Sequence, residues 1–209
     1  TLVIEGEPFE VTTLREDIET FGRKAKVAFG RDWACDATRR DFTIQGLSVS
    51  PDGVVHDAVG GLADIAAKRV RFIGEPSQRI AEDYLRILRF FRIHAAYGEG
   101  APDRDGYLAC IAGREGLAGL SAERIRMEMF KLVVAKGAAP ALIAMDDAGL
   151  LLRLTAGVVF HGAFAGMIAV ECELGLAPDP VRRLGALAVA VTEDAKRISQ
   201  RWRLSNVEA

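Results

Sequence analysis

The fold is decided by the stretch Glu82-Asp83-Tyr84-Leu85-Arg86-Ile87-Leu88-Arg89-Phe90-Phe91-Arg92. Its charged residues Asp83, Arg86 and Arg89 recur three apart, which places them along one flank of a helix. The apolar residues between them form the opposing stripe, which faces a core. Intrahelical ion pairing is the simplest explanation of the charges. Exposed pairs at this spacing stabilise a helix by only about 0.2–0.5 kcal/mol, so stability alone is a poor reason for three arginines here.

Outward from this helix, the composition changes at the breaker Gly74-Glu75-Pro76. Beyond it, β-branched runs become rare and apolar residues recur at helical spacing. We therefore predict an α+β chain with a boundary near residue 76, where an α+β part gives way to an all-helical part. The apolar positions that carry the helical spacing are Ile80, Leu85, Leu88, Phe91, Ala95, Ile125, Met129 and Leu132.

The part before residue 76 alternates strand signals with turn signals. Near the N-terminus apolar and polar residues alternate, Asp36 is placed to cap a helix, and Pro51-Asp52-Gly53 provides turn chemistry. The expected elements, in chain order, are a hairpin over 1–14, a strand over 26–29, a helix over 37–47, a hairpin over 47–59, a short helix to about 67 and a strand over 69–73.

Two segments of the helical part allow more than one interpretation. The most apolar stretch, 154–170, carries His161 in its middle and is too short to span a membrane. We expect a buried helix there, and no membrane partner. The basic segment 196–203 contains one aromatic residue, Trp202. It is either the solvated face of a helix or a weak RNA contact.

Composition limits the classes of function. With 27 Lys and Arg against 29 Asp and Glu, the net charge is -2, so no global basic field indicates a nucleic-acid partner. An RNA site would have to be local, and residues 68–92 hold seven basic residues against three acidic ones, a patch that can face phosphate. Cys35, Cys110 and Cys172 are far apart, which argues against a disulfide framework or a zinc site and fits the reducing cytoplasm.

A second charged constellation is Arg39-Arg40-Asp41-Phe42-Thr43-Ile44, in which two cations and an acid precede an apolar pair. If a rigid element holds them, the cations can grip a triphosphate in bidentate fashion while the carboxylate accepts from a ribose hydroxyl. An ion cluster at the start of a helix is the alternative interpretation.

The chemistry of the bases gives the first stretch a sharper interpretation. Cytosine and adenine each present an amino donor beside a ring-nitrogen acceptor on the pairing edge. An Asp acceptor beside an Arg donor complements both bases. Uracil and guanine present the reverse order and would oppose acceptor to acceptor. The pair Asp83 and Arg86 can therefore select C and A without a template.

The sequence offers no catalytic or metal-binding cluster. The one Asp-x-Asp is Asp103-Arg104-Asp105, which we expect in a loop, and its arginine opposes cation binding. The histidines His56, His94 and His161 have no nucleophile near them in the sequence. We therefore predict no catalytic residue and no metal ligand within these 209 residues.

Taken in order, these stretches resemble a known family. The segment 39–44 resembles the Arg-Arg-Asp-Phe-Thr-Ile-Asn-Ala motif, and 82–89 the Glu-Asp-x-x-Arg-x-x-Arg motif, of class II tRNA nucleotidyltransferases, the family of CCA-adding enzymes and bacterial poly(A) polymerases. Residues 57–64 and 69–74 are similar to the stretch that ends the family's head domain, and 120–125 to its neck helix. The resemblance covers about residues 11–152, with Gln45-Gly46 in place of the family's Asn-Ala.

The resemblance implies roles for six residues. Arg39, Arg40 and Asp41 would contact the ribose and phosphates of the incoming nucleotide. Asp83 and Arg86 would read the base edge, and Arg89 would support them or contact phosphate. The implied reaction is attack of the tRNA 3′-hydroxyl on the α-phosphate of CTP or ATP, assisted by Mg²⁺ in the complete enzyme.

The resemblance also implies an organisation for the chain. Residues 1–76 would be part of the nucleotidyltransferase head, 77–140 a helical neck that recognises the base, and 141–209 the start of a helical body that binds tRNA. The family's metal-binding Asp-x-Asp segment is expected ahead of Thr1, so we predict that the isolated chain is inactive. The alternatives are a noncatalytic nucleotide- or RNA-binding remnant of the family, poly(A) synthesis, or a purely structural helical adaptor.

Overall fold

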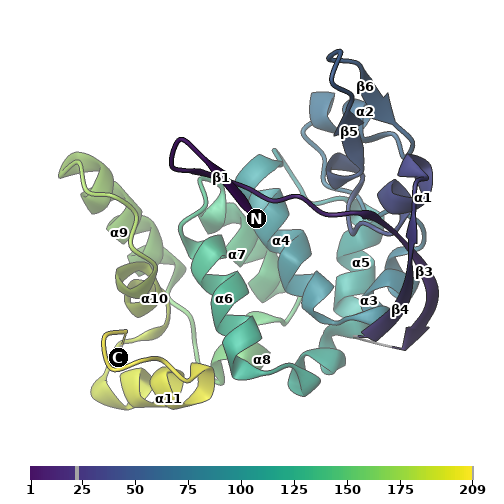
Figure 1. Ribbon diagram of the computed structural model, residues 1–209. Coiled ribbons are helices and arrows are strands. Elements are labelled where there is room, and N and C mark those ends of the chain that lie inside the picture. The colour runs from purple at the N-terminus through teal and green to yellow at the C-terminus, as the bar shows by residue number, and fades with distance from the viewer. Residues whose placement is uncertain (22–23, 209) are drawn as a thin grey trace.

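The computed structural model describes residues 1–21 and 24–208 of the chain. All of its named strands precede residue 76, and from Pro76 onward the regular elements of the described part are helices (Figure 1). Strands form three antiparallel pairs: β1 (Leu2–Ile4) with β2 (Glu7–Phe9), β3 (Leu14–Phe21) with β4 (Lys24–Gly30), and β5 (Leu47–Val49) with β6 (Val55–Asp57).

Helices occupy most of the rest of the chain. Before residue 76 they are short, comprising α1 (Trp33–Thr38), the 3-10 turn η1 (Thr43–Gln45) and α2 (Gly61–Ala66). The later elements are α3 (Pro76–Glu82), α4 (Leu85–Tyr97), α5 (Arg104–Gly113), the 3-10 turn η2 (Arg114–Gly119), α6 (Ala122–Val133), α7 (Ala138–Asp147), α8 (Leu151–Thr155), α9 (His161–Glu173), α10 (Pro180–Ala188) and α11 (Thr192–Trp202). This arrangement confirms the predicted α+β class.

Helix α4 is the centre of the core. Most of its apolar residues are buried, Leu88 and Phe91 completely, and it packs against α6 and α7. The rings of Phe42, Phe72 and Phe90 form a cluster, with centroids 4.8 Å apart for Phe42 and Phe72 and 5.4 Å apart for Phe72 and Phe90. One continuous core therefore joins the part before residue 76 to the helices.

Two of the predicted hairpins are confirmed. Strands β1 and β2 pair around a turn at Glu5-Gly6, whose two positive φ angles of 51° and 85° suit a tight hairpin turn. Strands β5 and β6 pair as expected around the turn at 51–53. The strand expected over 26–29 lies within β4, but its partner β3 was not predicted.

The expected helix over 37–47 is wrong. Asp32, not Asp36, caps the helix there, and α1 ends at Thr38. The chain is extended at Phe42, which forms an isolated antiparallel bridge with Phe72. The same bridge is all that forms of the strand expected over 69–73. Burial of two aromatic rings from distant segments outweighs the weak helical preference of this stretch.

The buried helix expected over 154–170 is also wrong. The stretch divides between α8 and α9, and most of α9 is exposed, with Phe164 and Glu171 as its buried residues. Near the C-terminus, Trp202 is buried and its indole N–H donates to the carbonyl of Leu154, so this aromatic residue packs in the core and does not present itself to RNA. In the described part of the chain, no helix has the length and apolar character needed to cross a bilayer.

Candidate functional site

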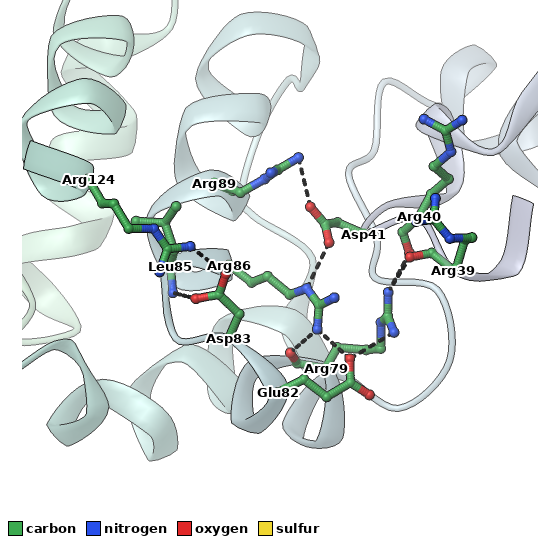
Figure 2. Close-up of polar contacts among 10 residues, drawn as sticks. All are labelled: Arg39, Arg40, Asp41, Arg79, Glu82, Asp83, Leu85, Arg86, Arg89 and Arg124. Atoms are coloured by element: carbon green, nitrogen blue, oxygen red, sulfur yellow. Dashed lines mark hydrogen bonds and ion pairs between the residues drawn. The ribbon is translucent and has the colours of Figure 1, made fainter. Parts of the chain in front are cut away.

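Asp83 lies between α3 and α4, not on the flank of a helix as its spacing predicted. Its backbone is extended, with φ −155° and ψ 108°, and it ends α3. One carboxylate oxygen accepts a hydrogen bond of 3.1 Å from the backbone N–H of Leu85, at the start of α4. The other accepts a hydrogen bond of 2.5 Å from Nη2 of Arg124 on α6, as Figure 2 shows. Two helices therefore fix this side chain.

Arg86 is held in the first turn of α4 with 15% of its side chain exposed. Its Nε donates to Asp41 at 2.7 Å, and one terminal nitrogen donates to Glu82 and to the carbonyl of Arg79, each at 2.5 Å (Figure 2). Among the residues that the structure describes, nothing accepts a hydrogen bond from its other terminal nitrogen. That nitrogen keeps two N–H donors for a ligand.

Asp41 joins the two charged constellations. Its Oδ1 accepts from Arg86 and its Oδ2 lies 2.7 Å from Nη2 of Arg89 (Figure 2). One residue of the first motif thus contacts two of the second, although more than 40 positions separate the two motifs in the sequence. Arg89 and Arg86 are on the same flank of α4, as their spacing predicted.

Arg39 and Arg40 sit at the edge of this cluster. Both pair with Asp36 of α1, at 3.5 Å and 2.8 Å respectively, and about half of the Arg40 side chain is exposed. Their backbone carbonyls accept hydrogen bonds of 2.9 Å and 2.7 Å from Arg79 of α3. The contacts described for the two guanidinium groups are with Asp36, whereas Asp41 pairs with Arg86 and Arg89.

Sequence reasoning missed Arg79, Glu82 and Arg124 as members of this cluster. Arg79 and Glu82 precede Arg86 by seven and four positions, a spacing that would have pointed to them, although in the structure they lie on α3 and Arg86 lies on the separate helix α4. Arg124 is 41 positions from Asp83 and meets it only because α4 packs on α6. No local pattern in the sequence predicts that contact.

The electrostatics keep both base-reading candidates charged. Burial raises the pKa of Asp83, but hydrogen bonds from Arg124 and Leu85 and the charges of Arg124 and Arg86 outweigh burial, so the pKa is lowered overall. Burial lowers the pKa of Arg86, but the hydrogen bond to Glu82 and the charge of Asp41 outweigh it and the pKa is raised. At neutral pH Asp83 is therefore an acceptor only, and Arg86 a donor only.

A buried carboxylate supports the segment that follows Asp41. Asp64 of α2 is fully buried and accepts 2.6 Å from the Thr43 hydroxyl, 2.7 Å from Nε of Arg69 and 3.1 Å from Nε of Arg71. The backbone N–H of Thr43 also bonds the carbonyl of Arg71 at 3.0 Å. These bonds fix the chain just beyond Asp41 and so restrict where its carboxylate can lie.

Where the family motif has Asn-Ala, this chain has Gln45-Gly46, and the surroundings of Gly46 explain why glycine replaces alanine. A Cβ added to Gly46 would lie 2.6 Å from Cγ2 of Val59, closer than side chains approach one another. The alanine of the family motif would therefore displace Val59 in this chain. Gln45 ends η1, and nothing in the structure explains its replacement of asparagine.

The basic residues of 68–92 are all paired. Lys68 bonds Glu99, Arg69 and Arg71 share Asp64, and Arg92 bonds Glu128 at 2.5 Å. The remaining three pair with Glu82 or Asp41. Several of these carboxylates lie outside 68–92 in the sequence, so the local positive charge is smaller than the sequence indicated.

The residues with metal- or proton-binding side chains have structural contacts. Asp103 caps α5 by accepting from the N–H of Gly106, and Asp105 lies inside that helix, not in a loop as expected. His161 bonds Asp146 at 2.9 Å, and burial lowers the pKa of His94. Among the side chains that the structure describes, which exclude those of residues 15–29 and 209, no three from His, Cys, Asp or Glu are grouped as a metal site would need.

Known proteins of one family resemble this chain in sequence. A family model described as the poly A polymerase head domain matches residues 1–71, and one described as a probable RNA- and SrmB-binding site of polymerase A matches 109–156. The mitochondrial CCA tRNA nucleotidyltransferase 1 of Mus musculus is 36% identical over 210 residues, covering 100% of this chain and 48% of that protein. A CCA-adding enzyme of Leuconostoc citreum is 39% identical over 152 residues, covering 71% of this chain and 37% of its own length.

Solved structures similar to this chain include CCA-adding enzymes. The crystal structure of the Bacillus stearothermophilus CCA-adding enzyme in complex with CTP matches 99% of this chain and 50% of that one, with a TM-score of 0.68 and 28% identity. The chain spans about half the length of the vertebrate relatives that it matches. On motifs, fold and relatives together, the chain belongs to the class II tRNA nucleotidyltransferase family, which comprises the CCA-adding enzymes and bacterial poly(A) polymerases.

Proposed function

We propose that this chain provides the nucleotide-selecting part of a template-independent RNA nucleotidyltransferase that adds C and A to tRNA 3′ ends from CTP and ATP. The observation that carries the proposal is the junction of α3 and α4, where an ionised Asp83 lies close enough to Arg86 for the arginine's charge to lower its pKa. Both side chains are fixed by neighbours, and both retain unused hydrogen-bonding capacity.

That capacity matches two of the four bases. Each carboxylate oxygen of Asp83 can accept two hydrogen bonds, and each accepts one from the protein. One terminal nitrogen of Arg86 is engaged, and the other is available within the described structure. An amino group of cytosine or adenine would donate to Asp83 while the adjacent ring nitrogen accepts from Arg86. Uracil and guanine would leave an acceptor facing the carboxylate, which is costly in a partly buried site.

The rest of the cluster suits the sugar and the phosphates. We assign Arg39, Arg40 and Arg89 to the phosphates, and Asp41 to the ribose as well as to holding Arg86. Arg40 is the most exposed of these arginines, and turning it away from Asp36 would leave its planar group free for two phosphate oxygens. In this scheme residues 77–140 form the base-recognising neck and 141–209 the start of a tRNA-binding body.

The proposed reaction is attack of the tRNA 3′-hydroxyl on the α-phosphate with release of pyrophosphate. A divalent metal, which we propose is Mg²⁺, would stabilise the developing charge. The described residues do not fit such an ion, because they present no group of three suitable ligands, and Asp103 is committed to capping α5. We therefore expect this 209-residue chain to bind nucleotide without transferring it.

The cysteines bear on the compartment. In the described structure no disulfide joins Cys35, Cys110 or Cys172, and Cys172 is exposed. We propose a reducing compartment, with the cytoplasm as first choice. The names of the vertebrate relatives make mitochondria the other compartment to examine.

Two other functions use the same pocket. The lack of a metal-binding group among the described residues fits a noncatalytic nucleotide- or RNA-binding remnant, which would select CTP and ATP in any context without transfer. The match of 1–71 to a poly A polymerase head favours poly(A) synthesis, for which ATP would bind in clear preference to CTP. Transfer assays on a longer protein that includes this chain separate these functions from C and A addition.

The test is binding of CTP, ATP, UTP and GTP to the chain and to its Asp83→Ala variant, measured by calorimetry with magnesium present. We expect preferential binding of CTP and ATP, and loss of the preference in the variant with folding intact by circular dichroism. Equal binding of all four nucleotides to the unchanged chain would contradict the assignment of Asp83 and Arg86.

A further inference from the structure

The charged cluster of Asp41, Arg86 and Arg89 is called the nucleotide cluster below. A basic pocket of about 660 Å³ lies beside it, between α2 and the C-terminal half of α4. Lys68 and Arg69 line it from the end of α2, Arg92 from α4, and Lys136 from the connection between α6 and α7. The one acidic residue among its described lining is Asp64, which is buried and committed to Arg69 and Arg71. The volume is that of a small-ligand or nucleotide site.

Ion pairing leaves this pocket positive. Lys68 pairs with Glu99, Arg92 with Glu128, and two arginines share the single carboxylate of Asp64. Lys136 is exposed and forms no ion pair with any residue that the structure describes. The four cations that line the pocket therefore have three carboxylate partners, and one of these, Asp64, is shared with Arg71 outside the pocket. The balance is positive and suits phosphate.

An aromatic ring adds a second chemistry at the same place. Tyr97, in the last turn of α4, lines the pocket and is 65% exposed. Within the described structure its hydroxyl has no hydrogen-bond partner, so the ring is not held for a structural bond. A single exposed tyrosine is ordinary, but a ring in a pocket lined by four cations is a combination that can hold a base and its phosphate.

The backbone at Lys68 adopts a conformation that is unusual for a residue with a side chain. Its φ angle is 49°, in the left-handed region where glycine is the residue of least cost. The carbonyl of Lys68 accepts 3.0 Å from the N–H of Glu99, which fixes the loop at the mouth of the pocket. A lysine in this conformation keeps an ammonium group at the pocket where glycine would be easier to accommodate.

We propose that this pocket binds the backbone phosphates of single-stranded RNA, with one base stacked on Tyr97. The inference rests on the proposed function, because an RNA 3′ end must reach the nucleotide at Asp41 and Arg86. Arg89, which contacts Asp41, precedes Tyr97 by eight residues of one helix, or about 12 Å along its axis. RNA that reaches the nucleotide can therefore lie along α4 with its preceding phosphates in the pocket.

The test is fluorescence anisotropy of a fluorescein-labelled ten-nucleotide single-stranded RNA bound to the whole chain over a series of salt concentrations. Lys136→Ala should weaken binding several-fold and reduce the slope of log affinity against log salt by about 0.7, the value for one phosphate of a single strand. Tyr97→Ala should weaken binding about tenfold, and Tyr97→Phe less than twofold, because stacking needs the ring only. Lys131→Ala, an exposed lysine on α6 outside the pocket, is the matched control.

Nucleotide binding measured on the same variants separates this inference from the proposed function. RNA binding that depends on Tyr97 and Lys136, with no CTP or ATP preference at Asp83, would support the pocket and refute the proposed function. RNA binding that is absent in the unchanged chain, or equal in the pocket variants and the Lys131→Ala control, would overturn the pocket. Loss of CTP affinity in Lys136→Ala with RNA binding unchanged would also overturn it, because the pocket would then hold nucleotide phosphates.

Discussion

At the scale of single residues, Gly61 has no room for a side chain. A Cβ there would lie 2.4 Å from the backbone oxygen of Thr43, and a backbone atom cannot move aside as a flexible side chain can. We expect Gly61→Ala to lower the free energy of unfolding by about 1–3 kcal/mol or more. Gly166→Ala, in the middle of α9 with nothing within 4 Å, should instead raise it by about 0.5–1 kcal/mol. Urea unfolding of both variants checks the contrast, and equal effects would contradict it.

The carboxylate of Asp64 gives a prediction about pH. Burial raises its pKa, but bonds from Thr43, Arg69 and Arg71 outweigh burial, so its pKa is lowered below 3.8 in the folded chain. The stability that Asp64 contributes is therefore fully present above about pH 4 and is lost as the pH falls through its folded pKa. Asp64→Asn should cost about 1–3 kcal/mol, because it removes a charged acceptor from three donors.

Because asparagine does not titrate, the stability gap between the chain and Asp64→Asn should stay constant from pH 7 to pH 5 and shrink only below about pH 4. Denaturant unfolding at a series of pH values measures the gap. A gap that shrinks between pH 7 and pH 5 would show that the folded pKa is raised, contrary to the hydrogen bonds described.

At the scale of elements, α6 supports the junction of α3 and α4 through Arg124. Removing this side chain leaves Asp83 with only the N–H of Leu85 to orient it. We expect Arg124→Ala to lower the free energy of unfolding by about 1 kcal/mol and to reduce the CTP and ATP preference without abolishing it. Lys131→Ala on the same helix should change neither. Unchanged selectivity in Arg124→Ala would mean that the ion pair between Arg124 and Asp83 helps to pack α6 but does not orient Asp83 for the base.

The amphipathic helices could be predicted from the sequence, because their periodic apolar residues are the ones that become buried. Ile80, Leu88 and Met129 are all 1% exposed or less. The helix expected over 37–47 failed because Phe42 is extended and pairs with Phe72, a contact 30 positions away. The prediction of a buried helix over 154–170 was wrong for a different reason. The apolar content of α9 predicts burial, but its apolar residues do not gather on one face that a neighbouring helix could cover.

The candidate site was predictable in its residue types more than in its contacts. Asp41 contacts Arg86 and Arg89, a meeting of the two motifs that neither motif predicts by its own spacing. The spacing of Asp83 from Arg86 indicated one helical flank, but Asp83 ends α3 with extended backbone and turns toward Arg124. Helix boundaries and long-range ion pairs depend on packing between elements, which periodicity within one element does not encode.

At the scale of the whole molecule, the aromatic cluster makes the two parts of the chain depend on each other. Phe90 of α4 stacks on Phe72 and is fully buried, so its ring belongs to both sides of the predicted boundary near residue 76. Phe90→Ala should lower the free energy of unfolding by about 3–5 kcal/mol. Hydrogen exchange should accelerate in segments 41–46 and 70–73 as much as in α4.

Exchange that accelerates in α4 alone would show that the two parts open independently, and the shared core would then contribute little to holding the nucleotide cluster together. Ile143→Ala on α7 is a suitable control, because Ile143 is 47% exposed and its loss should leave exchange in all three segments unchanged.

The most direct test of whether Asp83 reads the base removes the amino group of cytosine. CTP is compared with the triphosphate of the 2-pyrimidinone nucleoside, which lacks the amino group, on the chain and on Asp83→Ala. If Asp83 reads that amino group, the unchanged chain should bind CTP roughly 10- to 100-fold more tightly than the analogue, and the variant should bind the two within about twofold. Equal discrimination by the chain and the variant would show that Asp83 does not read the base.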